Sequence, residues 1–330
     1  MALLVLIVTL AVGVIPVSAM TITDDAGSTV TLNATPERIV SLSPSNTEIL
    51  AAIGLLDRVV GVTDVCDYPP DVENKTRIGG YSAISIEKVA AARPDLVIAS
   101  DLTPKETVTR LRETGLIVIV VAPRNIDHVI RDIRLIGTVT GSGQKADELA
   151  TDLSRRIAGA SATPGTSRPT VAHVVWHKPL YVSGNDTLQN DVIVHTGGRN
   201  VFADRSGWST VSLEEFLIAN PDIVIVSGGG GMDSSENDVI LEEFMTKPQY
   251  ASLAAVKNHH VYAIDADIIS RPGPRIADAA EEAGHIIQAF EEEQAAQQPV
   301  PAETRNTRAP GFSAVVAALA LCGICAVMRR

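Results

Sequence analysis

Residues 85–100 read SIEKVAAARPDLVIAS, and residues 212–227 read SLEEFLIANPDIVIVS. The offset between the two stretches is constant, 212 − 85 = 127, and the identical positions include the first serine, a glutamate two residues later and a Pro-Asp pair. Each copy predicts a helix capped by its serine, a break at Pro-Asp and a buried strand. A repeat at this distance predicts two similar lobes in one chain, with a cleft between them in which a small ligand binds.

The sequence around the repeat predicts an α/β fold of two Rossmann-like lobes with mostly parallel sheets. Continuous apolar runs alternate with helical stretches, which is typical of parallel strands covered on both faces. In the first lobe, we expect strands at 38–42, 58–62, 96–99 and 116–121, and helices at 47–54, 85–93 and 104–114. In the second lobe, we expect strands at 170–176, 223–226 and 261–264, and helices at 187–195, 212–219 and 275–292.

A long connecting helix is expected between the lobes. A helical stretch at 125–140 is followed by Gly-Ser-Gly and by a second helix, whose apolar positions 146, 149, 150, 153 and 157 share one face. About 16 residues at 1.5 Å per residue reach about 24 Å, which is enough to cross between two small lobes. Because a helical connector resists bending, we expect small lobe movement on ligand binding.

The bulk composition fits a globular chain of two domains and excludes some functions. The 330 residues carry 27 basic and 39 acidic side chains, for a net charge of −12, so nucleic acid is not an expected partner. Cys322 and Cys325 lie in an apolar tail, which leaves Cys66 alone. Neither a disulfide framework nor a metal site is expected.

The two ends of the chain differ from its middle. Residues 1–19 form an uncharged apolar run that ends in small residues and predicts a signal peptide, with a buried first strand as the alternative. Polar, proline-containing residues 293–309 predict a linker, and the apolar segment 310–330 ends in two arginines and predicts a membrane anchor or sorting segment. Between these ends, we expect the N-terminal lobe at 20–140, the connecting helix at 141–163 and the C-terminal lobe at 164–292.

Four residues of the repeat are candidates for function because they occupy equivalent positions in the two lobes. Glu87 and Glu214 each lie two residues after a capping serine, where a carboxylate stabilises its helix by about 0.3–1 kcal/mol. As a symmetric pair, with one carboxylate in each lobe, they are also candidates for a functional role. Tyr81 and Trp208 each lie four residues before that serine, so they suit the two lips of a cleft for a large flat ligand.

The other candidates come from the expected strand ends and loops. Ser43, Ser45 and Asn46 follow a strand, where open α/β folds bind ligands, and we expect Asn46 to cap the next helix. Tyr68 and Trp176 are secondary aromatic candidates, for which ordinary packing is the alternative. Arg271 suits an anionic group of a ligand, or is a solvated loop residue. His173 and His177 share one face of a strand and are interpreted as structural residues, since no further metal ligands accompany them.

Several longer segments resemble a known family. They are RIVSLSPSNTEILAAIGLLDRVVGVTDVCDYPP at 38–70, IGGYSAISIEKVAAARPDLVIAS at 78–100, VSLEEFLIANPDIVIVS at 211–227 and LAAVKNHHVYAID at 253–265. Together they resemble the substrate-binding proteins of ABC importers for cobalamin and ferric siderophores, the rigid class III with a helical backbone. The DYPP and IGGY stretches look most like the cobalamin branch. The C-terminal Pro-Gly-Phe, apolar run and basic end resemble the PGF-CTERM sorting signal of archaeal surface proteins.

The resemblance implies a transport function. A protein of this type binds cobalamin between its lobes and delivers it to an ABC permease dimer with a separate ATPase, and its paired glutamates meet permease arginines. It implies a ligand site at Ser43, Ser45, Asn46, Tyr68, Tyr81, Trp176, Trp208 and Arg271, with no enzymatic activity and no cofactor besides the ligand. It also implies a place on the extracellular face of the membrane, held by a C-terminal anchor or lipid. The alternatives are a ferric siderophore or haem as ligand, a secreted two-lobe enzyme, and a surface adhesion protein.

Overall fold

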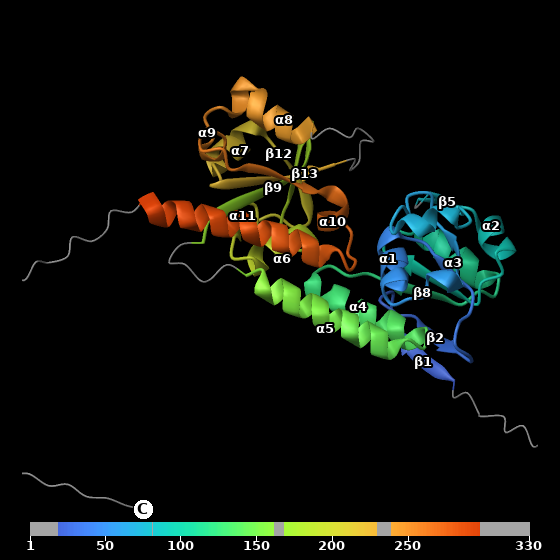
Figure 1. Ribbon diagram of the computed structural model, residues 1–330. Helices are drawn as coiled ribbons and strands as arrows, with labels where there is room; N and C mark the ends of the chain where they lie inside the picture. Colours follow the sequence, from blue (N-terminus) through green and yellow to red (C-terminus); the bar gives the residue numbers. More distant parts are fainter. Residues whose placement is uncertain (1–18, 81, 162–167, 230–238, 298–330) are drawn as a thin grey trace, which may run out of the picture.

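Two lobes lie side by side and are joined along one side by a pair of helices (Figure 1). This computed structural model describes residues 19–80, 82–161, 168–229 and 239–297. Each lobe is built on its own sheet. The predicted fold class is therefore confirmed.

The N-terminal lobe holds a four-stranded parallel sheet in the order β4-β3-β7-β8. The strand β7 is buried along its whole length, with Leu96 and Ile98 in the core on one face and Val97 and Ala99 in the core on the other. This is the double covering that its continuous apolar run predicts. The elements are β3 Ile39–Ser41, α1 Pro44–Ala52, β4 Val59–Val62, α2 Ile86–Ala91, β7 Leu96–Ser100, α3 Lys105–Glu113 and β8 Val118–Val121.

A small hairpin at the start of the described chain covers the open edge of this sheet. Its strands β1 Met20–Thr23 and β2 Thr29–Leu32 pair antiparallel, and the turn between them reaches β8. The Asp24 carboxylate accepts hydrogen bonds from the Val120 amide at 3.1 Å and from the Arg112 guanidinium at 2.7 Å. An edge strand covered in this way is protected from pairing with other chains. The lobe also contains η1 Leu56–Arg58, η2 Pro70–Asn74, β5 Gly79–Gly80 and β6 Ala83–Ile84.

The C-terminal lobe has a mixed sheet in the order β12-β10-β9-β13-β14, with β11 beside β9. The strands β9, β13 and β14 are parallel, whereas β10 and β12 run antiparallel and were not predicted from the sequence. Its strands are β9 Thr170–His177, β10 Leu180–Ser183, β11 Arg199–Asn200, β12 Trp208–Val211, β13 Ile223–Gly228 and β14 Val261–Asp265. Its helices are α6 Leu188–His195, α7 Leu213–Ala219, α8 Val239–Thr246, η3 Pro248–Tyr250, α9 Ala254–Lys257, α10 Ala266–Ser270 and α11 Ile276–Gln297.

The connector is a hairpin of two helices, α4 Ile126–Val139 and α5 Gly143–Gly159. The expected connecting helix is α5, whose far end is tied to α11 by ion pairs from Arg156 to Asp278 and Glu281. The helix α4 also reaches the second lobe, because the Ile126 amide donates to the carboxylate of Asp191 in α6 at 2.7 Å. Two helices rather than one therefore link the lobes.

Several element boundaries differ from the prediction by a few residues, and two of the differences have a clear physical reason. Ser43, not Asn46, caps the first helix of the N-terminal lobe, and Pro44 begins it, because proline fits the first helical turn without losing a hydrogen bond. Ser45 and Asn46 therefore lie inside α1. The last helix continues to Gln297 rather than ending at 292, since residues 293–297 are good helix formers.

The predicted signal peptide and C-terminal segment fall outside the described residues, apart from Ala19. Within the ranges that the structure describes, no helix is both long enough and apolar enough to cross a bilayer.

Candidate functional site

A cleft of about 550 Å³ opens between the lobes, and both lobes contribute to its walls. The N-terminal lobe supplies the start of α1 and the loops that follow β7 and β8. The C-terminal lobe supplies residues of β9, β10, β12, the end of β13, and α10 with the loop after it. The parallel strands of both sheets thus end at the cleft, where α/β folds bind their ligands.

The structure brings most of the predicted ligand-binding residues to this cleft. Six of the eight line it: Ser43, Ser45, Asn46, Trp176, Trp208 and Arg271. Tyr68 does not line the cleft, since its ring lies against the Arg275 guanidinium, 4.3 Å from the ring centroid. Tyr81 lies outside the described residues. The binding roles of these residues remain predictions.

Two tryptophans of the second lobe form an aromatic wall. The Trp208 side chain is 48% exposed, and its indole N–H donates to Gln189 Oε1 at 3.3 Å. The Trp176 indole N–H donates to the Lys178 carbonyl at 3.1 Å, and its ring stacks on His177 with centroids 4.9 Å apart. Because these hydrogen bonds fix both rings, the wall is formed before any ligand arrives.

The facing wall in the first lobe is partly apolar and was missed from the sequence. Leu102 is 64% exposed and Val65 is 42% exposed, although both are large aliphatic residues. Exposed apolar side chains that gather at one place mark a binding surface. Leu102 follows a predicted strand by three residues, so the strand-end rule that selected Ser43 also points to it.

A polar corner at the start of α1 is held by its own hydrogen bonds. The Ser43 hydroxyl caps α1 by accepting from the Asn46 amide at 3.3 Å. The Asn46 side-chain amide donates to the carbonyl of Ala99 at 3.2 Å. Asn46 is only 2% exposed, so its first role is to fix the end of β7 against α1.

Arg271 belongs to an ion cluster that joins the two lobes. Its guanidinium pairs with Asp67 at 2.6 Å, with Asp267 at 2.8 Å and with Glu48 at 3.3 Å. Arg275 binds Glu48 through two hydrogen bonds of 2.7 and 3.0 Å. Although burial alone would raise it, the pKa of the Asp67 carboxyl is lowered by the hydrogen bond and charge of Arg271. Arg271 is therefore neither a solvated loop residue nor an unpaired cation.

Glu87 and Glu214 are both exposed, on α2 and α7 of the two lobes. In Figure 1, both helices lie away from the α4–α5 hairpin. The Ser85 hydroxyl donates to Glu87 Oε2 at 3.1 Å. Backbone hydrogen bonding at the helix start, together with Ser85, lowers the pKa of Glu87. In α7, Glu215 rather than Glu214 closes the capping box with Ser212. Glu214 makes no ion pair with any described residue.

His173 is a structural residue in this fold. It is fully buried between strands, with Nδ1 2.8 Å from Ser183 Oγ and Nε2 3.4 Å from Ser227 Oγ. Burial lowers its pKa to about 3, so the ring stays neutral. Among the described residues, no group of three His, Cys, Asp or Glu side chains is placed to hold a metal ion.

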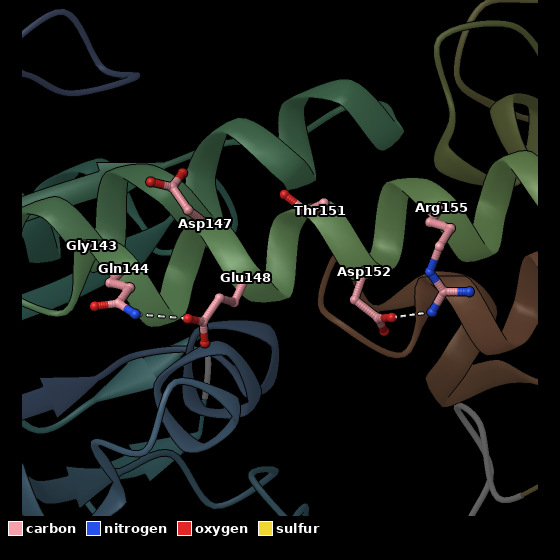
Figure 2. A pocket seen from close by; sticks show the side chains of 7 residues that line it. All are labelled: Gly143, Gln144, Asp147, Glu148, Thr151, Asp152 and Arg155. Carbon is pink, nitrogen blue, oxygen red and sulfur yellow. Dashed lines mark hydrogen bonds and ion pairs between the residues drawn. The ribbon is translucent and has the colours of Figure 1, made fainter.

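A second hollow runs along α5 and is a poor site for a ligand. Figure 2 shows that the residues lining it, from Gly143 to Arg155, belong to this one helix. Its side chains pair with each other, since Gln144 donates to Glu148 at 2.9 Å and Arg155 pairs with Asp152. A single helix cannot enclose a ligand, so the cleft between the lobes is the candidate site.

The chain is similar to known binding proteins. A family profile described as periplasmic binding protein matches residues 39–268. The chain is 30% identical over 277 residues to an uncharacterised ABC transporter substrate-binding lipoprotein of Bacillus subtilis. That alignment covers 81% of this chain and 85% of the relative.

Two further similarities concern proteins with named ligands. The chain is 30% identical over 254 residues to a vitamin B12-binding protein of Photorhabdus laumondii, which covers 76% of this chain and 88% of that protein. The solved structure of a periplasmic heme-binding protein from Roseiflexus, in its apo form, superposes with a TM-score of 0.69 at 27% identity. That superposition covers 78% of this chain and 99% of the Roseiflexus protein.

Proposed function

The chain belongs to the periplasmic binding protein family, and from this premise we propose that it binds cobalamin between its lobes and delivers it to the permease of an ABC importer. The observation that carries the proposal is the cleft of about 550 Å³ with Trp176 and Trp208 on one wall and Leu102 on the other. Clefts that bind small molecules measure about 300–1,000 Å³ and combine apolar walls with a few fixed polar groups.

Cobalamin and haem, the nearest alternative, differ in what they require from the walls of the cleft. Haem iron in proteins takes an axial ligand from His, Cys, Met or Tyr. Among the described lining residues, Tyr181 is the only side chain of these four types. A corrinoid carries its own axial ligands, so it needs from the protein only a complementary, partly apolar surface. The vitamin B12-binding relative supports cobalamin as the first candidate. Tyr181 and the heme-binding structure support haem as the second candidate.

Calorimetry on the purified protein tests the ligand. We expect cyanocobalamin to bind with one molecule per chain and a Kd of about 1 μM or tighter. Haem and a ferric hydroxamate, titrated in the same buffer, should bind at least about tenfold more weakly. Tighter binding of haem would transfer the proposal to haem. No heat from any chelate would contradict the transport function and leave the enzyme or adhesion alternatives.

Delivery is proposed to use Glu87 and Glu214, with one carboxylate facing each permease subunit. Both carboxylates are exposed and they lie on different lobes. Charge-assisted pairs with arginine fix docking geometry more than they add affinity. Replacing both by arginine should abolish uptake by the permease and its separate ATPase while cobalamin affinity stays unchanged. Unchanged uptake would refute the docking role, and the matched control is Glu148→Arg on α5.

The place of action is proposed to be the extracellular face of the membrane, with the C-terminus as anchor. The support is the apolar segment at 310–330 and the lipoprotein nature of the Bacillus relative. Intact mass of the native protein tests this, because removal of the segment and addition of a lipid change the mass in opposite directions. A native mass that still includes residues 310–330 and no lipid would show that the segment is kept as a plain membrane anchor.

A further inference from the structure

We infer that the cleft selects its ligand by charge. It binds a bulky chelate without net negative charge more tightly than an anionic chelate of the same size. The inference rests on the proposed function and narrows it to neutral or cationic chelates that present hydrogen-bond donors.

The cleft holds no available positive charge among the residues that the structure describes there. Arg271 is the only lysine or arginine on its described walls. Its guanidinium already contacts three carboxylates, those of Glu48, Asp67 and Asp267. A guanidinium offers five N–H donors, and these pairs occupy its outer edge. An anionic ligand would therefore have to compete with carboxylates that the protein holds in place.

Two carboxylates meet the cleft from opposite lobes. Asp101 follows β7 in the first lobe, and Asp267 lies in α10 of the second. Asp101 makes no ion pair with any described residue, and the nearby Arg124 is exposed outside the lining of the cleft. Asp267 pairs with Arg271 but remains 36% exposed. Two carboxylates against one guanidinium leave the described walls with a net negative charge.

The two carboxylates differ in exposure, since Asp101 is exposed and Asp267 is half-buried beside Arg271. Desolvation raises the pKa of Asp101, and it also raises the pKa of Asp267 even though Arg271 opposes it. A ligand that brings N–H donors to these carboxylate oxygens forms hydrogen bonds with them. A ligand that brings a carboxylate instead faces like charge on both walls, which is strongly unfavourable at short range.

A matched pair of ligands tests the inference. Cyanocobalamin has a rim of amide side chains, and mild acid hydrolysis converts one amide to a carboxylate without changing the size of the molecule. We expect these monocarboxylates to bind the wild-type protein at least about tenfold more weakly than cyanocobalamin at pH 7.5. In Asp101→Asn the ratio should fall to about threefold or less. It should stay at its wild-type value in Asp147→Asn, which alters an aspartate of α5 outside the cleft. Asp267→Asn provides a second variant, and thermal melts confirm that each variant folds.

The outcomes separate this inference from the proposed function. Equal or tighter binding of the monocarboxylates would overturn charge selection while cobalamin binding stands. An affinity ratio unchanged in both Asp101→Asn and Asp267→Asn would also overturn it, since the carboxylates would then not be its source. If neither chelate binds, the proposed function fails and charge selection fails with it.

Discussion

Glu48 is 3% exposed and yet meets charged partners, because two arginines of the other lobe reach it. Arg275 binds Glu48 through two hydrogen bonds, and the Arg275 guanidinium also lies over the Tyr68 ring. Removing one partner of a buried pair leaves the other charge without compensation, which costs about 3–5 kcal/mol. Burial thus makes this contact between the lobes far stronger than a surface ion pair.

The change Glu48→Ala should therefore lower the free energy of unfolding by about 3 kcal/mol, because it leaves the half-buried Arg275 without its carboxylate. Chemical denaturation followed by circular dichroism measures this value. Glu148→Ala on the exposed face of α5 is the matched control and should change stability by about 0.5 kcal/mol or less. A loss in Glu48→Ala no larger than in the control would mean that water reaches the cluster.

Asp132 should make the protein less stable as pH rises. Its side chain is fully buried, and burial raises its pKa from 3.8 to about 7, because Arg131 is shared with Asp25 and Asp101 adds like charge. A carboxyl whose folded-state pKa is raised contributes stability that is complete below pH 3.8 and is lost as pH rises through 7. Asp132→Asn should gain about 1–3 kcal/mol relative to wild type between pH 5 and pH 8. A difference that does not change with pH would show that Arg131 keeps the carboxyl charged throughout.

At the scale of elements, the α4–α5 hairpin depends on one close approach. A Cβ added at Gly137 would overlap the Cβ of Ala146 on the facing helix, whereas one added at Gly159 meets nothing within 4 Å. Alanine normally stabilises a helix by about 1 kcal/mol relative to glycine. Gly137→Ala should instead destabilise the protein by about 1–3 kcal/mol, since the helices must move apart. Gly159→Ala is the control and should be neutral or stabilising, with both read from thermal unfolding. A more stable Gly137→Ala variant would mean that the two helices can move apart without loss of stability.

The sequence predicts elements with a strong period and misses those set by distant contacts. The helix α5 was predicted because its apolar positions share one face, and β7 because its apolar run is continuous. The strands β10 and β12 were missed because they form an antiparallel edge that the repeat does not contain.

The same limit applies to the candidate site. Strand ends, the repeat, the scarce aromatic residues and a loop arginine led to six residues that line the cleft. The role of Arg271 in the ion cluster was missed because its partner Glu48 lies 223 residues away, and no local pattern links the two. Asn46 was expected to cap a helix, whereas the helix begins at Pro44 and Ser43 caps it.

At the scale of the whole molecule, the lobes are joined at two separate places. The α4–α5 hairpin ties them along one side, through Arg156 and the Ile126 amide. The ion cluster of Glu48, Arg271 and Arg275 ties them beside the cleft. A hinge needs a few residues that absorb large changes in φ and ψ. A helical hairpin and an ion cluster around the buried Glu48 both resist such changes.

The distance between the lobes should therefore change little when ligand binds. Spin labels on Glu106 of α3 and Glu242 of α8, both exposed and on different lobes, report this distance by pulsed electron resonance after Cys322 and Cys325 are replaced by serine. We expect a narrow distribution that shifts by about 2 Å or less on adding cyanocobalamin. In Glu48→Ala the distribution should broaden, because only the helical joint remains. A shift of about 10 Å in the wild-type protein would show a true hinge. An unchanged width in Glu48→Ala would assign the rigidity to the hairpin alone.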